Sequence, residues 1–373
     1  MQIKYLQTSD LDLLEAAINE LSSADGVTGI MMLASDHENL QNGRLNDLLQ
    51  GAEVPIFGGI FPGLIFERRV RREGIVLVSC SQRISVGVLK DIQEKGESLE
   101  SEMAGLYANF SGWAKSIFLF PDGLSGQIGQ FMETLFMTLG LEYNYVGGGC
   151  GSLSMSQKPS VICNQGVLQD AVVIAATELD SGVGVGHGWT AMGALMKVTA
   201  ASGNIIQELD YQPAFDVYSK ALEETEGVVA NPEDFFEVSK GYPFGIQKLD
   251  AEDVVRDPIA VNQGKHILCV GEVEKGDYVR ILKGDPRSLL DAAGQAARYA
   301  VESKSSLPRN FAFFVDCISR VLYLDQEFQQ EVDVVTEATG DLPLFGVLSL
   351  GEIANNRKEY LEFYNKTSVV ACF

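Results

Sequence analysis

The sequence predicts an α/β (α+β) protein with two lobes of mixed β-sheets that are covered by helices. A short glycine-bearing pattern occurs three times, at residues 54–59, 144–149 and 342–347. The chain has 373 residues, of which 46% are apolar, so it can fill the cores of two domains. Together these observations indicate one structural unit that is used three times, in a chain long enough for two lobes.

The segments around each copy of the pattern agree in kind and in order. An apolar run typical of a buried strand precedes each copy, and another follows it after a polar loop. In chain order these six runs are 29–34, 75–78, 116–120, 171–176, 311–315 and 368–372. A stretch with helical spacing lies before each copy, and the clearest one places Leu324, Phe328, Val332 and Val335 on one face. We therefore expect strand, helix, strand, loop and strand in each unit.

A glycine stands where each of these three helices is expected to end. Gly51, Gly140 and Gly340 occupy positions at which a chain that leaves a helix often adopts a left-handed conformation. Glycine adopts that conformation without a side-chain clash. We therefore expect each helix to stop at its glycine.

A change of pattern near residue 210 predicts a boundary between two domains, 1–209 and 210–373. Short strands that read as a meander precede the boundary, at 183–185, 195–199 and 204–209. The segments expected after it are a helix over 213–222, an acidic surface connection over 223–257 and a hairpin over 267–282.

A further helix is predicted to begin at residues 285 and 286. Asp285 suits the N-cap, because its carboxylate accepts a free backbone N–H, and Pro286 suits the first helical position. The residues expected to form the buried stripe of this helix are Leu289, Ala293, Ala296, Ala297 and Ala300.

The formal charge of −23, from 28 basic and 51 acidic residues, argues against partners that are themselves negative. Nucleic acid and anionic membrane surfaces would be repelled, so neither is expected as a partner. The sequence shows no secretory leader and no apolar run near the roughly 18 residues of a membrane span. We expect a cytoplasmic protein whose six cysteines are reduced and lie mostly in its core.

Motifs that would identify a common enzyme or metal site do not occur. The chain lacks a Gly-x-x-x-x-Gly-Lys phosphate loop, a Gly-x-Ser-x-Gly turn, Cys-x-x-Cys and His-Glu-x-x-His. Its histidines, His37, His187 and His266, have no second ligand at metal spacing, so we expect no metal site. Alternating glycines over 182–188 predict a strand whose bare face lets a backbone or a ligand approach.

Several short motifs, taken in their order, resemble the FIST family, whose name abbreviates F-box and intracellular signal transduction. Residues 186–189, 208–210 and 213–218 are similar to the junction of the two FIST halves. Residues 120–123 and 146–149 are similar to the N-terminal half. The motifs similar to the C-terminal half are 257–259, 285–286, 314–320, 351–354 and 364–367. The resemblance covers nearly the whole chain and implies a FIST N-terminal domain over 1–209 and a FIST C-terminal domain over 210–373.

The resemblance implies a cytoplasmic sensory module without an established catalytic reaction. Such a module binds a small ligand, such as an amino acid, and works with signalling proteins such as histidine kinases, cyclases or chemotaxis components. Some family members are described as haem proteins that sense nitric oxide. In that alternative His187 would be the axial ligand, whereas a buried, hydrogen-bonded structural histidine is the competing interpretation.

Polar side chains that follow strand ends suggest where a ligand would bind. Ligands of α/β proteins favour the crevice at the carboxyl ends of strands. The candidate ligand-binding residues are Asp122, His187, Trp189, Cys317, Ser319, Arg320, Gly351, Glu352 and Asn365. Arg320 and Glu352 would hold the carboxylate and the amine of an amino acid. In the alternative, these two side chains pair with each other.

Two other kinds of function remain open at this point. Cys317 lies between Asp316 and Arg320, and a nearby cation would lower the pKa of its thiol and activate it as a nucleophile. A single cysteine without a neighbouring histidine is a weak signal, so we do not expect an enzyme. Alternatively, the protein is an interaction platform without a small ligand, whose acidic surface selects basic partners.

Overall fold

Each of the three predicted units forms the centre of a six-stranded mixed sheet. The computed structural model describes residues 1–8, 10–36, 40, 43–96, 98–249, 252–303, 308–355 and 361–373. In every unit the first strand pairs in parallel with the glycine-bearing strand and antiparallel with the last strand. In unit order these strands are β2 (Gly29–Ser35), β3 (Ile56–Phe61) and β6 (Ile75–Cys80); β8 (Ser116–Pro121), β9 (Asn144–Gly148) and β12 (Ala171–Thr177); β21 (Ala312–Cys317), β22 (Leu344–Ser349) and β25 (Ser368–Cys372). The predicted α/β fold class is confirmed.

Each sheet is completed by a hairpin from a different unit. The hairpins are β4 (Gly63–Phe66) with β5 (Arg69–Arg71), β10 (Val161–Cys163) with β11 (Gly166–Leu168), and β23 (Glu352–Asn355) with β24 (Glu362–Tyr364). The first hairpin follows β3 in the chain but pairs with β22 of the third unit. The second pairs with β3 of the first unit, and the third pairs with β9 of the second unit. The three units therefore exchange hairpins in a closed ring.

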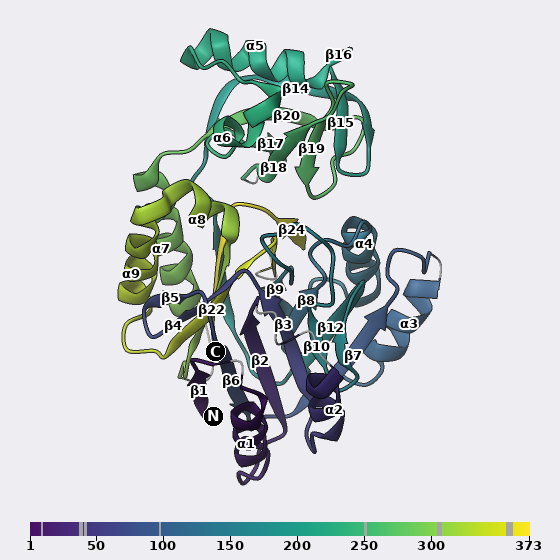
Figure 1. Cartoon of the computed structure of the whole chain (residues 1–373), viewed down its shortest axis with the longest axis vertical. Coiled ribbons are helices and arrows are strands. Elements are labelled where there is room, and N and C mark those ends of the chain that lie inside the picture. Colours follow the sequence, from purple (N-terminus) through teal and green to yellow (C-terminus); the bar gives the residue numbers. More distant parts are fainter. Residues whose placement is uncertain are drawn as a thin grey trace.

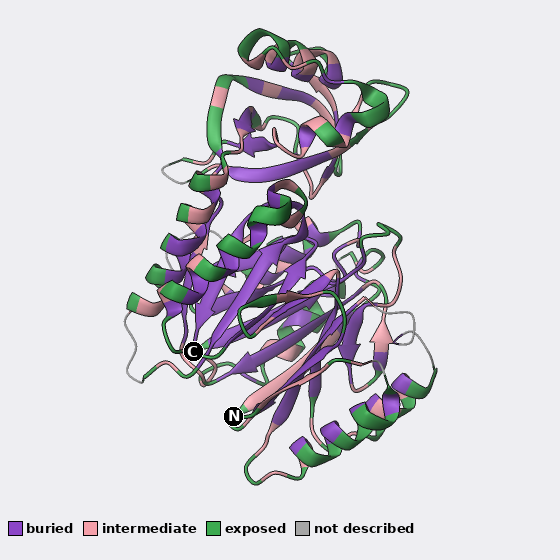
Figure 2. Ribbon diagram, turned by 60° about the vertical axis from the view of Figure 1, so that its left-hand side comes forward, coloured by how far each residue is buried: buried purple, intermediate pink, exposed green. Residues whose placement is uncertain are grey.

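The inner faces of the three sheets meet in one core, which is seen as the buried strands of Figure 2. Its aromatic members are Phe57, Phe61, Phe118, Phe120, Phe311, Phe313, Phe345 and Phe373. The outermost strands on the other side of each sheet are β1 (Ile3–Leu6), β7 (Ile84–Lys90) and β13 (Gly182–Gly186). Aromatic rings fill much of the space between the three sheets in the described part of the chain.

Helices cover the outer faces of the sheets (Figure 1). These helices are α1 (Leu11–Ser22) and α2 (Gly43–Gly51) on the first sheet, α3 (Ser98–Tyr107) and α4 (Ile128–Leu139) on the second, and α7 (Pro286–Glu302), α8 (Ile318–Leu324) and α9 (Phe328–Thr339) on the third. Gly140 and Gly340 end their helices with φ angles of 70° and 66°, as predicted. Helix α2 also ends at its glycine, Gly51, but this residue does not adopt the expected left-handed conformation.

A second, smaller lobe is formed by residues 190–283 and lies at the top of Figure 1. Its strands, in sheet order, are β14 (Thr190–Ser202), β20 (Tyr278–Lys283), β17 (Phe244–Ile246), β18 (Val254–Val261), β19 (Ile267–Val270), β15 (Ile205–Leu209) and β16 (Gln212–Pro213). The helical segments of this lobe are α5 (Ala214–Glu226), η2 (Pro232–Asp234) and α6 (Phe235–Ser239), while η3 (Asp325–Glu327) belongs to the large lobe. The expected boundary between residues 209 and 210 lies inside the small lobe, between β15 and β16.

The structure corrects three local predictions for the small lobe. Residues 223–257, expected as a surface connection, include β17, the start of β18 and buried side chains such as Arg256. The expected hairpin over 267–282 does not form, because β19 pairs with β15 and β18 whereas β20 pairs with β14 and β17. Strand β13 belongs to the large lobe, so it does not form a meander with β14 and β15.

The glycines of β13 allow helix α7 to pack directly on the strand. A Cβ atom on Gly184 would lie 1.9 Å from the carbonyl oxygen of Ala296. The predicted N-cap of α7 is confirmed, since Asp285 Oδ1 accepts the backbone N–H of Ser288 at 3.0 Å, and the predicted apolar stripe is buried. The bare face of the strand therefore accommodates a helix backbone and not a ligand.

Candidate functional site

A cavity of about 370 Å³ lies between the two lobes, beyond the carboxyl end of β21; we call it the interlobe cavity. The large lobe contributes Leu153, Met155, Cys317, Ile318, Ser319, Leu322, Leu350, Gly351 and Asn365. The small lobe contributes Phe236, Asp257, Ile259 and Val270. Most of these residues are apolar, and four of the nine predicted site residues are among them. The wall of the cavity therefore needs both lobes.

Asp257 of the small lobe links the two lobes at the edge of this cavity. Its Oδ2 atom accepts a hydrogen bond from Ser319 Oγ at 2.5 Å. Its Oδ1 atom lies 3.1 Å from Lys366 Nζ, and both side chains are almost fully buried. The Lys366 ammonium group also donates to the carbonyl of Lys240 and lies 5.2 Å from the centre of the Trp189 ring. These charge-assisted contacts hold the small lobe over the cavity.

Asn365 is the polar group of the cavity wall whose hydrogen-bonding capacity is unused. The residue is 1% exposed, and neither its Nδ2 nor its Oδ1 atom has a hydrogen-bond partner among the described residues. A buried polar group without a partner costs about 1–3 kcal/mol, so its amide is available to a ligand that offers a donor and an acceptor.

The environment of Cys317 keeps its thiol protonated. Burial is the largest cause, and the nearby carboxylates of Glu352 and Asp257 add to it, so the pKa of the thiol lies well above its ordinary value. The expectation that Arg320 would lower this pKa is wrong, because burial and negative neighbours outweigh the cation. Cys317 therefore lines the cavity as a neutral, weakly polar group and not as an activated nucleophile.

Arg320 lies behind the cavity and not in its wall. The side chain is fully buried, with its Nε and Nη2 atoms 2.9 and 2.5 Å from Glu331 Oε1. The Nε atom is also 3.3 Å from Asp316 Oδ1. Its Nη1 atom donates to the carbonyls of His187 and Lys366, and Nη2 also donates to that of Leu289. With every nitrogen engaged, Arg320 offers no donor to a ligand.

Glu352 is likewise withdrawn from the cavity. Its carboxyl group accepts hydrogen bonds from Ser349 Oγ at 2.7 Å and from the backbone N–H of Thr367 at 3.2 Å. Burial raises the pKa of Glu352 to about 8. The predicted clamp of Arg320 and Glu352 is thus not formed at the cavity, and the alternative pairing of these two side chains is also absent, because Arg320 pairs with Glu331 on α9.

His187 and Trp189 support the site from the junction of the lobes. The Nδ1 atom of His187 accepts the backbone N–H of Trp189 at 2.9 Å, and the indole of Trp189 donates to the carbonyl of Lys366. Burial, with a smaller effect from Arg320, lowers the pKa of His187 to about 4. His187 does not line the interlobe cavity. Its Nδ1 atom is used by Trp189 and its Nε2 atom lies 3.6 Å from Glu252 Oε2, so these described surroundings do not fit the role of an axial haem ligand.

Asp122 stabilises the loop after β8 and does not line the interlobe cavity. Its carboxylate accepts hydrogen bonds from the backbone of Asp170, the side chain of Gln157 and the backbone of Leu124. Among the described residues no group of three or more His, Cys, Asp or Glu side chains could hold a metal ion. Likewise, in this part of the chain no helix is both long and apolar enough to cross a membrane. His37, named in the sequence analysis, lies outside the described residues.

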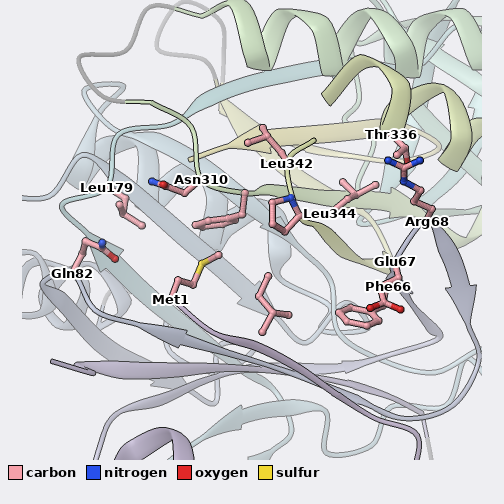
Figure 3. Close-up of a pocket in the computed structure, with 13 residues that line it drawn as sticks. Met1, Phe66, Glu67, Arg68, Gln82, Leu179, Asn310, Thr336, Leu342 and Leu344 are labelled. Atoms are coloured by element: carbon pink, nitrogen blue, oxygen red, sulfur yellow. The ribbon is translucent and has the colours of Figure 1, made fainter. Parts of the chain in front are cut away.

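A larger hollow of about 700 Å³ lies at the opposite ends of the strands (Figure 3). The side chains of Met1, Gln82, Asn310 and Leu342 surround it, and the charged groups of Glu67 and Arg68 at its rim are exposed. None of its lining residues carries a buried polar atom that lacks a partner. The interlobe cavity is therefore the better candidate for recognition of a small ligand.

Sequence reasoning missed two residues of this site, Asp257 and Lys366. Both belong to motifs that mark the resemblance, at 257–259 and 364–367, but neither motif indicated that the two side chains meet across the lobes. Asp257 lies in β18 and Lys366 lies between β24 and β25, more than 100 residues further on, so no periodic pattern signals the contact.

Fold and site together define a two-lobed α/β protein with a small, largely apolar cavity between its lobes. The model of the FIST N domain matches residues 29–212, and the model of the FIST C domain matches residues 214–355. The chain belongs to the FIST family. Domains of this family act as sensors in signal transduction.

The other comparisons add no functional information. A search of curated proteins finds no match. A solved chorismatase structure shares 10% sequence identity with this chain at a TM-score of 0.35, covering 100% of this chain and 97% of its own. A similarity at this level supports no argument about the chemistry of the chain.

Proposed function

We propose that this chain is a cytoplasmic sensory module that binds a small, largely apolar ligand of amino-acid size in the interlobe cavity. The observation that carries the proposal is Asn365, a buried amide with no partner among the described residues, in a wall that is mostly apolar. A volume of about 370 Å³ lies within the range of small-ligand sites. The ligand would combine an apolar body with a group that both donates to and accepts from the amide.

Contacts from both lobes explain how binding would become a signal. The wall combines Asp257, Ile259 and Val270 of the small lobe with Cys317 and Asn365 of the large lobe. A ligand that touches both lobes stabilises the arrangement in which they are closed, and so shifts the population of lobe positions. Signalling proteins such as histidine kinases, cyclases or chemotaxis components would respond to that shift.

A thermal-shift screen against amino acids, their amides and their N-acetyl derivatives tests this function. We expect at least one apolar member to raise the melting temperature of the wild-type chain, because a ligand that binds only the folded state stabilises it. Asn365→Leu keeps the volume but removes the amide, and should abolish the shift. Asn109→Leu, in the exposed turn after α3, is the control and should respond like the wild type.

The same screen distinguishes the sensor from an interaction platform. If no compound stabilises the chain, and native mass spectrometry of the purified protein finds no retained small molecule, the platform interpretation replaces the ligand-binding one. If a stabilising compound acts equally on wild type and Asn365→Leu, the cavity assignment is wrong.

A further inference from the structure

A second cavity of about 340 Å³ adjoins the interlobe cavity; we call it the adjoining cavity. The two cavities share three wall residues, Met155, Ile259 and Val270. On the large lobe the adjoining cavity is lined by residues 123–126, 128 and 129, from the loop after β8 and the first turn of α4. On the small lobe its wall includes Arg256, Gly271 and Glu272.

Arg256 brings a buried positive charge to this cavity, and among the described residues no carboxylate makes a direct ion pair with it. The residue is 8% exposed, and its Nε atom donates to the carbonyl of Glu272 at 2.8 Å. Its Nη1 atom donates to the carbonyls of Val255 and Phe363, whereas its Nη2 atom donates to no described residue. The carboxylates of Glu362, Asp277 and Glu272 act on it only from beyond ion-pair distance, and burial outweighs them and lowers the pKa of Arg256. A buried charge without a direct counter-ion is costly, so the free Nη2 atom attracts an anion.

The opposite wall of the adjoining cavity already accepts a carboxylate. The glycines at 123, 126 and 129 bring no side chains into this wall. The backbone N–H of Gly129 donates to Glu272 Oε1 at 3.3 Å, and a Cβ atom on Gly129 would lie 2.2 Å from Glu272 Oε2. The N-terminus of a helix favours negative charge, and here a glutamate of the other lobe supplies it.

Gly271 leaves the space between Arg256 and Asn365 open. A Cβ atom built on Gly271 would lie 3.2 Å from Arg256 Nε and 3.2 Å from Asn365 Oδ1. The φ angle of 81° at this residue also favours glycine. The guanidinium group of Arg256 in the adjoining cavity and the amide of Asn365 in the interlobe cavity are therefore neighbours. Any side chain at position 271 would come between them.

We propose that the adjoining cavity is the anionic subsite of the ligand site and takes a ligand carboxylate between Arg256 and the first turn of α4. The inference rests on the proposed function and deepens it. The ligand is then a small apolar carboxylate with an amide group, such as an N-acylated amino acid. Its carboxylate competes with that of Glu272, whose contact with Gly129 joins the two lobes. Binding would thus exchange an internal contact between the lobes for one made by the ligand.

Isothermal titration of the full chain with N-acetyl-leucine and with its neutral isostere N-acetyl-leucinamide tests the subsite. We expect the carboxylate to bind roughly tenfold more tightly, since charge-assisted hydrogen bonds to a buried guanidinium are strong. Arg256→Met should remove this preference and leave the binding of the amide in place. Arg280→Met is the matched control, because Arg280 belongs to the same lobe but pairs with Asp253, and it should keep the preference.

Glu272→Gln gives an independent measurement that does not depend on the folding of Arg256→Met. Removal of the competing negative charge should tighten the binding of N-acetyl-leucine several-fold and leave the affinity for N-acetyl-leucinamide unchanged. Equal affinities of the two compounds for the wild type would overturn the subsite while leaving the proposed function intact. Failure of N-acetyl-leucine to bind, or an unchanged affinity in Glu272→Gln, would also overturn the subsite.

Discussion

Two buried arginines of this protein, Arg320 and Arg256, differ in what surrounds their charge. Arg320 contacts Glu331 at 2.5 Å and Asp316 at 3.3 Å, and every nitrogen of its guanidinium group is engaged. Arg256 is held by backbone carbonyls and faces a cavity, and no carboxylate of the described residues pairs with it directly. A buried cation that pairs directly with carboxylates orders the elements around it, whereas one without a direct ion pair retains attraction for an anion from outside. The counter-ion, more than burial, separates a structural arginine from a binding one.

The largest expected effect comes from removing the balanced charge. Arg320→Met leaves the carboxylates of Glu331 and Asp316 buried without their cation, and should lower the free energy of unfolding by about 3–5 kcal/mol. Urea denaturation followed by circular dichroism measures the loss. Lys220→Met removes a charge from an exposed pair and should cost less than about 0.5 kcal/mol. If Arg320→Met lowers the free energy of unfolding by less than about 1 kcal/mol, Arg320 does not have the structural role that separates it from Arg256.

Asn365→Leu should act in the opposite direction on stability. Replacing an amide with two unpaired buried atoms by an apolar side chain of similar size should raise the free energy of unfolding by about 1–3 kcal/mol. Asn164→Leu is the contrast, because its side chain makes hydrogen bonds with the backbone of Ile56 and Val54, and this change should destabilise the protein. Both values come from denaturant titration, and a loss of stability in Asn365→Leu would show that the amide is already satisfied.

Glu352 should give the protein a measurable pH dependence above neutrality. Its folded-state pKa of about 8 lies above its ordinary value of 4.5, so its contribution is complete below pH 4.5 and is lost as the pH rises to 8. His187, with its pKa lowered to about 4, acts in the opposite direction only below pH 6.5. Between pH 6.5 and 8 the free energy of unfolding should therefore fall, by up to about 1.4 kcal/mol per unit from Glu352.

The variant Glu352→Gln isolates this contribution. Burial also raises the pKa of Asp316, which acts in the same direction as Glu352. Denaturation midpoints measured between pH 6.5 and 8 should therefore show a shallower slope in Glu352→Gln than in the wild type. Identical slopes would mean that the Glu352 carboxyl is ionised throughout this range.

Gly271→Ala is expected to have the smallest effect on stability of these variants, but a selective effect on ligand binding. Gly271→Ala should cost about 1 kcal/mol from the strained φ angle, and the new methyl group should block the space between Arg256 and Asn365. Gly227→Ala imposes a similar strain at a φ of 68° where no atom lies within 4 Å. Titration with N-acetyl-leucine should show lost binding only in Gly271→Ala, and equal binding by both variants would remove Gly271 from the site.

The fold could be predicted from the sequence because its signals are local and repeated. Apolar runs, helical spacing and the N-cap at Asp285 each depend on a few neighbouring residues. The ring of exchanged hairpins could not be predicted, because the strand that β4 joins lies about 280 residues further along the chain.

The candidate site shows the same division between local signals, which can be read from the sequence, and long-range contacts, which cannot. Cys317, Ser319 and Asn365 follow strand ends and line the interlobe cavity as expected. Arg320 follows the same strand, but one further residue on a helix turns its side chain away from the cavity and towards Glu331 on α9. Arg256 lay in a segment interpreted as a surface connection, because acidic residues and two prolines concealed the start of β18.

The exchanged hairpins also bear on how the large lobe could have originated. In each unit the hairpin pairs with another unit, and the glycine-bearing strand pairs with a hairpin from a third. A single unit on its own would therefore expose two unpaired strand edges. Three separate copies of such a unit, related by a threefold rotation, could each pair their hairpin with the sheet of the next copy, as in a domain-swapped trimer. The present chain has the form of that assembly fused end to end, with the small lobe inserted between β13 and α7 of the third sheet.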